Sequence, residues 1–330
     1  MKTVLVPGGA GYIGSHTVYA LVESGAEVVV IDNLETGYEK AIHPKARFYR
    51  GDIRDCAFLD SVFSHESIDA VIHFAANSLV GESMTDPLKY YDNNVGGTRC
   101  LLRSMVRHNI NIVVFSSTAA VYGEPENIPI LESDRTAPAN AYGETKLAME
   151  RMFGWTELAH GIRYVSLRYF NACGAHECGE IGEAHKPETH LIPIVLQAAG
   201  GKRENVSVYG SDYDTRDGTC VRDYVHVMDL AEAHVLAVDH LLKGGKSDIF
   251  NLGNGVGFTV SEVIKTAENV TGRPIPVAVA PRRAGDPAQL VASSQKARDV
   301  LGWNPRTPSL KAIVGTAWHW HRSHPNGYQD

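Results

Sequence analysis

The chain has 330 residues, 44% of them apolar, and its 31 Lys and Arg against 38 Asp and Glu give a formal net charge of −7. This acidic balance argues against a nucleic-acid binder, which normally carries a basic face. No apolar run approaches the roughly 18 residues of a membrane span, and too few residues precede the first glycines for a signal peptide, so we expect a cytoplasmic globular enzyme.

Through the first 170 residues, short β-branched runs alternate with longer amphipathic segments. The runs are almost continuously apolar, as in parallel strands that are covered on both faces. The predicted strands are residues 3–6, 27–31, 46–49, 70–74, 112–116 and 164–167, and the predicted helices are residues 13–24, 57–64, 88–108 and 141–159. This alternation predicts an α/β fold built on a Rossmann-type doubly wound parallel sheet.

The first predicted strand runs into a turn with glycine at positions 8, 11 and 14. Glycine lets the backbone turn tightly and lets a pyrophosphate approach the next helix, whose N-terminal N–H groups and dipole favour negative charge. Alone, the cluster could be a simple turn. However, Asp32 ends the second strand about 20 residues later, where an acid binds adenosine ribose hydroxyls and repels a 2′-phosphate. The glycine turn and Asp32 together predict that the cofactor is NAD rather than NADP.

Tyr142 and Lys146 stand four residues apart on a predicted helix and therefore share one face. A tyrosine pKa near 10 is too high for a base at neutral pH, and a nearby cation lowers it. Such pairs are common on helix surfaces, but Ser116, Ser117 and Thr118 end a predicted strand at the edge where this fold binds ligands. Together these residues predict a tyrosine base with a lysine cation and a strand-end hydroxyl.

After Phe170 the alternation stops. Residues 171–190 look like a long loop, and a helix is predicted at 191–199, a strand at 206–209, a helix at 227–242 and a strand at 249–252. Loops longer than about 12–15 residues in compact domains are usually functional or disordered. We expect one domain over residues 1–171, with returning segments within about 221–255. Residues 172–330 are then mainly a smaller, loop-rich mixed α/β lobe.

The five cysteines are scattered, odd in number and without a CxxC pair. This pattern fits reduced thiols better than a disulfide framework. Cys173, His176 and Cys178 have a spacing that fits no common zinc site. The sequence therefore predicts reduced thiols and no bound metal.

In its motifs the chain resembles the extended short-chain dehydrogenase/reductases, and within them the UDP-glucose 4-epimerases, nearly from end to end. The glycine turn and the Tyr142–Lys146 pair are shared by the whole superfamily. The more diagnostic segments are residues 71–76, 80–83, 90–94, 168–171, 218–224 and 280–286.

The resemblance implies NAD-dependent interconversion of UDP-glucose and UDP-galactose through a 4-keto sugar. Tyr142 would take the proton of the C4 hydroxyl while hydride passes from C4 to NAD⁺. Thr118 would hydrogen-bond the C4 oxygen, and Lys146 would bind the nicotinamide ribose. Thr118 is followed by Ala119 and Ala120 rather than by the acidic pair of related dehydratases, which weighs against 4,6-dehydration.

The same resemblance implies two sets of binding residues. The cofactor set is Gly8, Gly11, Tyr12, Ile13, Gly14, Asp32, Asn33, Asp52, Ile53, Phe74, Ala75, Asn93, Tyr142, Lys146 and Phe170. The substrate set is Thr118, Tyr142, Asn171, Leu191, Tyr209, Arg222, Arg283 and Asp286. The arginines also fit on physical grounds, because a guanidinium fork suits a diphosphate, although solvated surface charges are the plain alternative. Asp52 is placed for the adenine, although a turn acid is the alternative there.

The first domain then becomes the NAD-binding domain and the second lobe the UDP-sugar-binding one. Family members pair through the helices at 88–108 and 141–159, so we expect a homodimer. Pro7 and Ser78 depart from the family pattern and leave the strength of NAD retention open, and Leu290 leaves acceptance of UDP-N-acetylglucosamine open. The first alternative is a 4-epimerase of another UDP-sugar, such as UDP-N-acetylglucosamine or a UDP-pentose. The second is a non-catalytic NAD-sensing module. Such a module would be expected to lack Tyr142 or Lys146.

Overall fold

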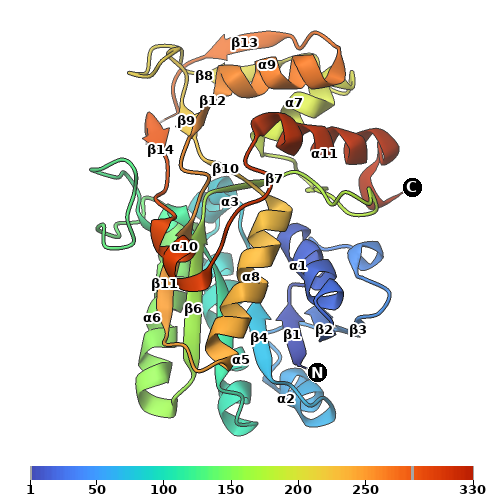
Figure 1. The fold of residues 1–330 in the computed structure, drawn as a ribbon, viewed down its shortest axis with the longest axis vertical. Coiled ribbons are helices and arrows are strands. Elements are labelled where there is room, and N and C mark those ends of the chain that lie inside the picture. The colour runs from blue at the N-terminus through green and yellow to red at the C-terminus, as the bar shows by residue number, and fades with distance from the viewer. Residues whose placement is uncertain (1, 284–285, 330) are drawn as a thin grey trace.

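The apolar runs of the first half form the strands of one parallel sheet. In the computed structural model, which describes residues 2–283 and 286–329, seven strands pair in the order β11-β6-β5-β4-β1-β2-β3 (Figure 1). They are β1 (Thr3–Pro7), β2 (Glu27–Asp32), β3 (Arg47–Arg50), β4 (Ala70–His73), β5 (Ile112–Thr118), β6 (Arg163–Tyr169) and β11 (Asp248–Leu252). The predicted α/β fold is confirmed, and the strand predicted at 249–252 becomes the edge strand β11.

Burial on both faces explains why these strands are almost continuously apolar. Val28 and Val30 of β2 join one core cluster, whereas Val29 and Ile31 join the cluster on the opposite face. The first cluster is covered by α1 (Tyr12–Glu23), α8 (Val227–Leu242) and α10 (Gln295–Leu301). The second is covered by α2 (Cys56–His65), α5 (Gly97–Arg107) and α6 (Ala141–His160). The inner strands therefore bury successive side chains in different helix layers, whereas the edge strand β3 begins and ends with an exposed arginine.

A second group of elements lies above the large sheet in Figure 1 and has its own core. That core packs α7 (Leu191–Ala199), α9 (Val260–Thr271) and α11 (Leu310–Ser323) against β8 (Val206–Tyr209), which pairs in parallel with β13 (Val277–Ala280). β7 (Asn171–Cys173) pairs with β10 (Tyr224–His226), and β9 (Val221–Arg222) lies between β12 (Phe258–Thr259) and β14 (Gln289–Leu290). A 3-10 turn at Gly327–Gln329 ends the described chain.

The single helix predicted at 88–108 is wrong in detail. The chain forms α3 (Val80–Thr85), α4 (Pro87–Tyr90), a π-helical turn at Tyr91–Gly96 and then α5. Inside that turn, the amide of Asn94 donates to the Asn77 carbonyl (3.1 Å) and to Thr145 Oγ1 (3.0 Å), and its Oδ1 accepts from the Asn77 N–H (2.8 Å). Such π-helical turns are frequent at functional sites, and this one ties three segments together.

The prediction of reduced thiols is wrong for one pair. Cys56, at the start of α2, forms a disulfide with Cys100 of α5, while Cys173, Cys178 and Cys220 are free. The two helices cover the same face of the sheet, so the fold brings together cysteines that are 44 positions apart in the chain. Their spacing in the sequence carries no sign of that contact.

Two further points bear on the predictions. Among the described residues, no helix is long and apolar enough to cross a bilayer. Ala284 and Gly285, part of the segment at 280–286 that carries the family resemblance, lie outside the described residues.

Candidate active site

The glycine turn leads from β1 into α1 at the edge where the parallel strands end. Gly8 has a φ of +83°, and a Cβ placed there would lie 2.5 Å from the backbone nitrogen of Ala75. A Cβ on Gly14 would lie 2.1 Å from the Gly8 carbonyl oxygen. Both glycines are therefore required by close backbone approach, and they leave the first turn of α1 open to a ligand.

Asp32, at the end of β2, is held in place by backbone donors. Its Oδ2 accepts from the Ala10 N–H (3.0 Å) and its Oδ1 from the Leu34 N–H (2.9 Å). Burial raises the pKa of this carboxyl group, and the two N–H donors oppose that rise. An oriented acceptor beside a glycine turn fits the ribose of a dinucleotide.

The tyrosine and lysine predicted to act together both lie near the end of β5. Asn140 caps α6 by accepting from the Gly143 N–H (2.8 Å), which starts the helix just before Tyr142. Lys146 is buried, donates to the Ser116 carbonyl (2.8 Å) and lies 5.9 Å from the Tyr142 ring centroid. The fold thus places the ammonium between the strand end and the phenol.

The electrostatics of this pair differ from expectation. Burial raises the pKa of Tyr142 to about 12, and the Thr118 hydroxyl opposes the rise. Burial also lowers the pKa of Lys146 to about 7, and the negative charge of Glu150 opposes this lowering. The expected lowering of the phenol pKa is therefore not found for the protein's own groups, because burial raises this pKa. A phenolate at neutral pH needs further positive charge.

A buried polar network fixes α6 against the sheet below this pair. Glu150 accepts two hydrogen bonds from Arg168, at 2.9 and 2.6 Å, and one from the Ser117 hydroxyl at 2.6 Å. Arg168 also donates to the Tyr122 hydroxyl (2.9 Å). Because the carboxylate is satisfied by β5 and β6 together, it positions the helix that carries Tyr142 and Lys146.

One cavity of about 1180 Å³ brings most of the predicted residues together. Ligand pockets commonly hold about 300–1,000 Å³, so this one has room for more than one small ligand. From the cofactor set its walls contain Gly8, Gly11, Tyr12, Ile13, Gly14, Asp32, Asn33, Ile53, Phe74, Ala75, Asn93, Tyr142, Lys146 and Phe170. From the substrate set they contain Thr118, Tyr142, Asn171, Arg222, Arg283 and Asp286, and Ser78 and Leu290 also line it.

Three of the predicted binding residues do not line the described part of this cavity. The carboxylate of Asp52 accepts hydrogen bonds from Arg54 (2.8 Å) and Asn33 (3.0 Å), and Arg54 lowers its pKa to about 2. Leu191 begins α7 and packs against the core of the second lobe. Tyr209 supports the site indirectly, because the Arg283 guanidinium lies 3.8 Å from its ring centroid. Their contacts with ligands stay predictions.

The positive side chains of the site are held by the second lobe. Arg222 forms an ion pair with Asp286 and donates to the Val221 carbonyl (2.8 Å). Asn171 donates its amide to the Asp223 carbonyl (3.0 Å), across the β7–β10 pair. Arg222 and Arg283 can therefore meet a diphosphate from elements that lie outside the large sheet.

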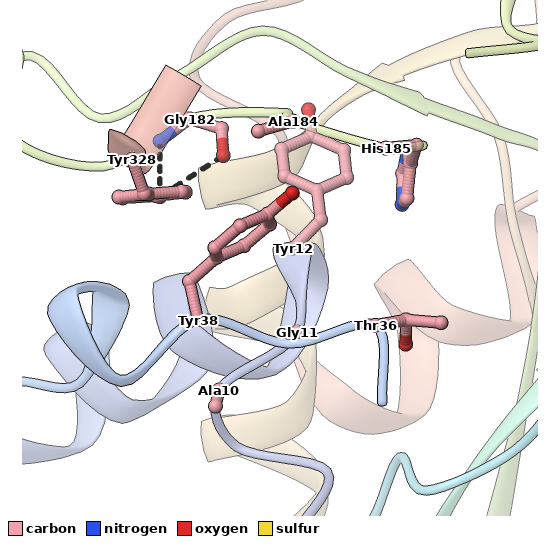
Figure 2. A pocket seen from close by; sticks show the side chains of 9 residues that line it. All are labelled: Ala10, Gly11, Tyr12, Thr36, Tyr38, Gly182, Ala184, His185 and Tyr328. Carbon is pink, nitrogen blue, oxygen red and sulfur yellow. Dashed lines mark hydrogen bonds between the residues drawn. The ribbon is translucent and has the colours of Figure 1, made fainter. Parts of the chain in front are cut away.

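The sequence analysis missed the part of the wall that follows β7. His185, Pro187, Glu188, Thr189 and His190 line the cavity. Figure 2 shows the start of this segment, from Gly182 to His185, beside Tyr12 in the first turn of α1, around a small void of about 10 Å³. The available signal is the alternation of Glu and His at positions 183, 185, 188 and 190.

Comparison with known proteins agrees with this geometry. Residues 4–253 match the NAD dependent epimerase/dehydratase family, and the chain belongs to that family. It is 61% identical over 325 residues to the UDP-glucose 4-epimerase of Halalkalibacterium halodurans, covering 98% of this chain and 97% of that one.

Two solved structures are close in fold. A crystal structure of a UDP-glucose 4-epimerase superposes with a TM-score of 0.98 at 56% identity and covers all of both chains. The Bifidobacterium longum UDP-glucose 4-epimerase in complex with NAD⁺ and UDP gives a TM-score of 0.93 at 42% identity, covering 99% of this chain and 100% of that one. The resemblance and the fold class expected from the sequence are confirmed.

Proposed function

We propose that this chain is an NAD-dependent isomerase that interconverts UDP-glucose and UDP-galactose by reversible oxidation at C4. The observation that carries the proposal is the shared cavity, in which the glycine turn, Tyr142, Lys146 and Arg222 face one space. The chain's likeness to UDP-glucose 4-epimerases over nearly its full length identifies the reaction.

The residues have separate tasks in the proposed mechanism. Tyr142 takes the proton of the C4 hydroxyl and later returns it, and Thr118 hydrogen-bonds the C4 oxygen. NAD, when bound by the residues of the glycine turn and Lys146, would supply hydride acceptance and return at C4 and a positively charged ring. Lys146 adds positive charge beside the phenolate and donates to the strand end. General acid–base catalysis of this kind contributes about 10²–10⁴-fold.

Inversion at C4 requires that the 4-keto sugar present either face to the same hydride donor. We propose that Arg222 and Arg283 hold the diphosphate while the sugar turns about its link to UDP. The ion pair to Asp286 and the stacking on Tyr209 support this role, because they restrict both guanidinium groups. The volume of the cavity leaves space for the turn.

A direct test is incubation of the purified NAD-loaded protein with UDP-galactose and no added reductant. We expect UDP-glucose to accumulate until equilibrium. Release of a 4-keto-6-deoxy sugar, or no turnover, contradicts the proposal. UDP-N-acetylgalactosamine run in parallel decides whether Leu290, in the cavity wall, leaves room for an N-acetyl group.

We also propose a homodimer that forms through α6 and the neighbouring helices. Trp155 and Leu158 stand one turn apart on α6 and are 73% and 79% exposed, and Leu88 on α4 is 78% exposed. Large apolar side chains gathered on a helix face mark interaction sites in otherwise polar surfaces. The same helices are those expected to pair from the family resemblance.

Two organisational proposals complete this picture. We assign residues 1–171, with returning segments within about 221–255, to NAD binding. We assign residues 172–330 mainly to binding of the UDP-sugar. The place of β11 in the large sheet supports the returning segment. We place the reaction in the cytoplasm, because NAD and UDP-sugars are charged molecules that do not cross a bilayer unaided.

A further inference from the structure

Four titratable side chains converge in the segment between β7 and α7. One ligand atom from each of Glu183, His185, Glu188 and His190 lies within 4.8 Å of all the others. Nδ1 of His185 is 3.1 Å from Glu183 Oε1 and 3.9 Å from Glu188 Oε2, while Nδ1 of His190 is 2.6 and 3.6 Å from the same two carboxylates. Each imidazole thus faces both carboxylates.

These separations match the ligand shell of a small cation. A tetrahedral Zn²⁺ with bonds of about 2.0–2.1 Å to nitrogen and oxygen keeps its ligand atoms about 3.3 Å apart. The four measured separations, from 2.6 to 3.9 Å, lie on both sides of that value. Because all four ligand atoms lie within 4.8 Å of one another, modest side-chain shifts would complete the shell.

The charges of the cluster are also compatible with a bound cation in place of the histidine protons. The Glu183 and Glu188 side chains are only 4% and 5% exposed. Buried carboxylates are costly unless they are paired. Within the described residues, neither carboxylate has a Lys or Arg within ion-pair distance, and the two histidines are their ion-pair partners. One divalent ion and two carboxylates form a neutral set.

The surrounding structure holds the cluster in position. Glu188 Oε1 accepts from the backbone N–H groups of Thr189 (2.8 Å) and His190 (2.9 Å). Just before Glu183, the Gly182 N–H donates to the Tyr328 hydroxyl (2.9 Å), which donates back to the Gly182 carbonyl (3.1 Å; Figure 2). Ligands that are oriented by outer contacts are typical of metal sites.

We propose that Glu183, His185, Glu188 and His190 bind one divalent transition-metal ion of the zinc class. Two imidazoles and two carboxylates suit Zn²⁺, whereas Mg²⁺ and Ca²⁺ prefer oxygen ligands alone. Four protein ligands leave no open position, so the ion is structural. It fastens the segment against Tyr12 of α1, whose ring is edge-on to His185 at 5.9 Å, and so fixes one wall of the ligand cavity.

The test measures bound metal in the NAD-loaded protein. The protein is treated with EDTA, incubated with Zn²⁺, separated from free metal on a desalting column and analysed by mass spectrometry of the metal. We expect about one zinc ion per chain in the wild type. His185→Ala and Glu188→Gln should each lose most of it. His176→Ala is the matched control, because His176 lies in the same loop outside the cluster and should leave the zinc content unchanged.

A second measurement separates this site from loose binding elsewhere. Co²⁺ substituted into the wild type should give the visible ligand-field absorption of a tetrahedral ion, and Glu188→Gln should lose it. Wild-type protein that retains no zinc overturns the proposal. Equal zinc in the wild type and in a folded His185→Ala or Glu188→Gln variant means an adventitious ion only and overturns it as well. If His185→Ala fails to fold, the wild-type stoichiometry and the Glu188→Gln spectrum decide.

Discussion

Tyr142 does not become a base through its helix neighbour alone. Burial holds its pKa at about 12, and the same burial lowers the pKa of Lys146 to about 7. At neutral pH the phenol is therefore protonated, and the lysine carries only part of its positive charge. A bound NAD⁺ ring would supply further positive charge near Tyr142 and would favour proton removal by this residue.

The first prediction concerns the phenol itself. Tyr142→Phe removes the only atom of that side chain that can accept the C4 proton, so kcat for UDP-galactose should fall by at least about 10²-fold. The NAD content of the purified variant should stay near that of the wild type. Tyr164→Phe, which changes a phenol of β6 outside the described cavity wall, is the control and should keep normal turnover. Near-normal activity in Tyr142→Phe would show that another group is the base.

The second prediction follows from the lowered pKa of Lys146, about 7 instead of 10.5. Between these values the unfolded chain binds more protons than the folded protein, so this residue makes the free energy of unfolding rise with pH. The stability of the wild type relative to Lys146→Met should therefore increase from about pH 7 to about pH 9. Urea denaturation of both proteins, at matched cofactor content, measures the difference. A difference that is constant or falls with pH contradicts the lowered pKa.

At the scale of elements, predictability depends on whether the cause is local. The strands and the glycine turn were predictable because Val28 to Ile31 and Gly8 carry their structural reason in their own residue type. The break in the helix at 88–108 was not, because Asn94 is held by Asn77 and Thr145 from other segments. The disulfide and the Glu183–His190 segment were missed for the same reason, since packing creates the contacts.

The third prediction tests how the C-terminal helix fixes the loop after β7. A Cβ on Gly182 would lie 2.3 Å from Cδ2 of the buried Trp320 in α11. Gly182→Ala should therefore lower the free energy of unfolding by about 1–3 kcal/mol, the usual cost of overpacking. Gly315 lies in α11 itself, and a Cβ there would have no neighbour within 4 Å beyond the adjacent residues and the helix's own backbone. Gly315→Ala should therefore raise the free energy of unfolding by about 0.4–1 kcal/mol. Thermal or urea denaturation distinguishes the two, and equal effects would contradict the predicted clash.

At the scale of the whole molecule, buried polar contacts join the two parts. Asp223, which is fully buried, accepts from the backbone N–H groups of Asn254 (2.6 Å), Gly255 (3.1 Å) and Ala292 (3.1 Å). Ile130 also pairs with the segment at 291–293 through two backbone hydrogen bonds. Arg222, beside Asp223, is thus placed by the same contacts that join the lobes.

The last prediction concerns the proposed dimer. Leu158 is 79% exposed on α6, whereas Lys146 and Glu150 of the same helix are buried. If Trp155 and Leu158 form the contact between subunits, Leu158→Arg places an unpaired charge in an apolar interface and should dissociate the dimer. The monomer should stay folded, because surface substitutions typically change stability by less than about 0.5 kcal/mol.

Leu242→Arg, at the end of α8, is the matched control and should leave the molar mass unchanged. Light scattering on a sizing column measures the mass of all three proteins. A wild-type monomer, or a Leu158→Arg protein of unchanged dimeric mass, would show that this face of α6 does not pair the subunits.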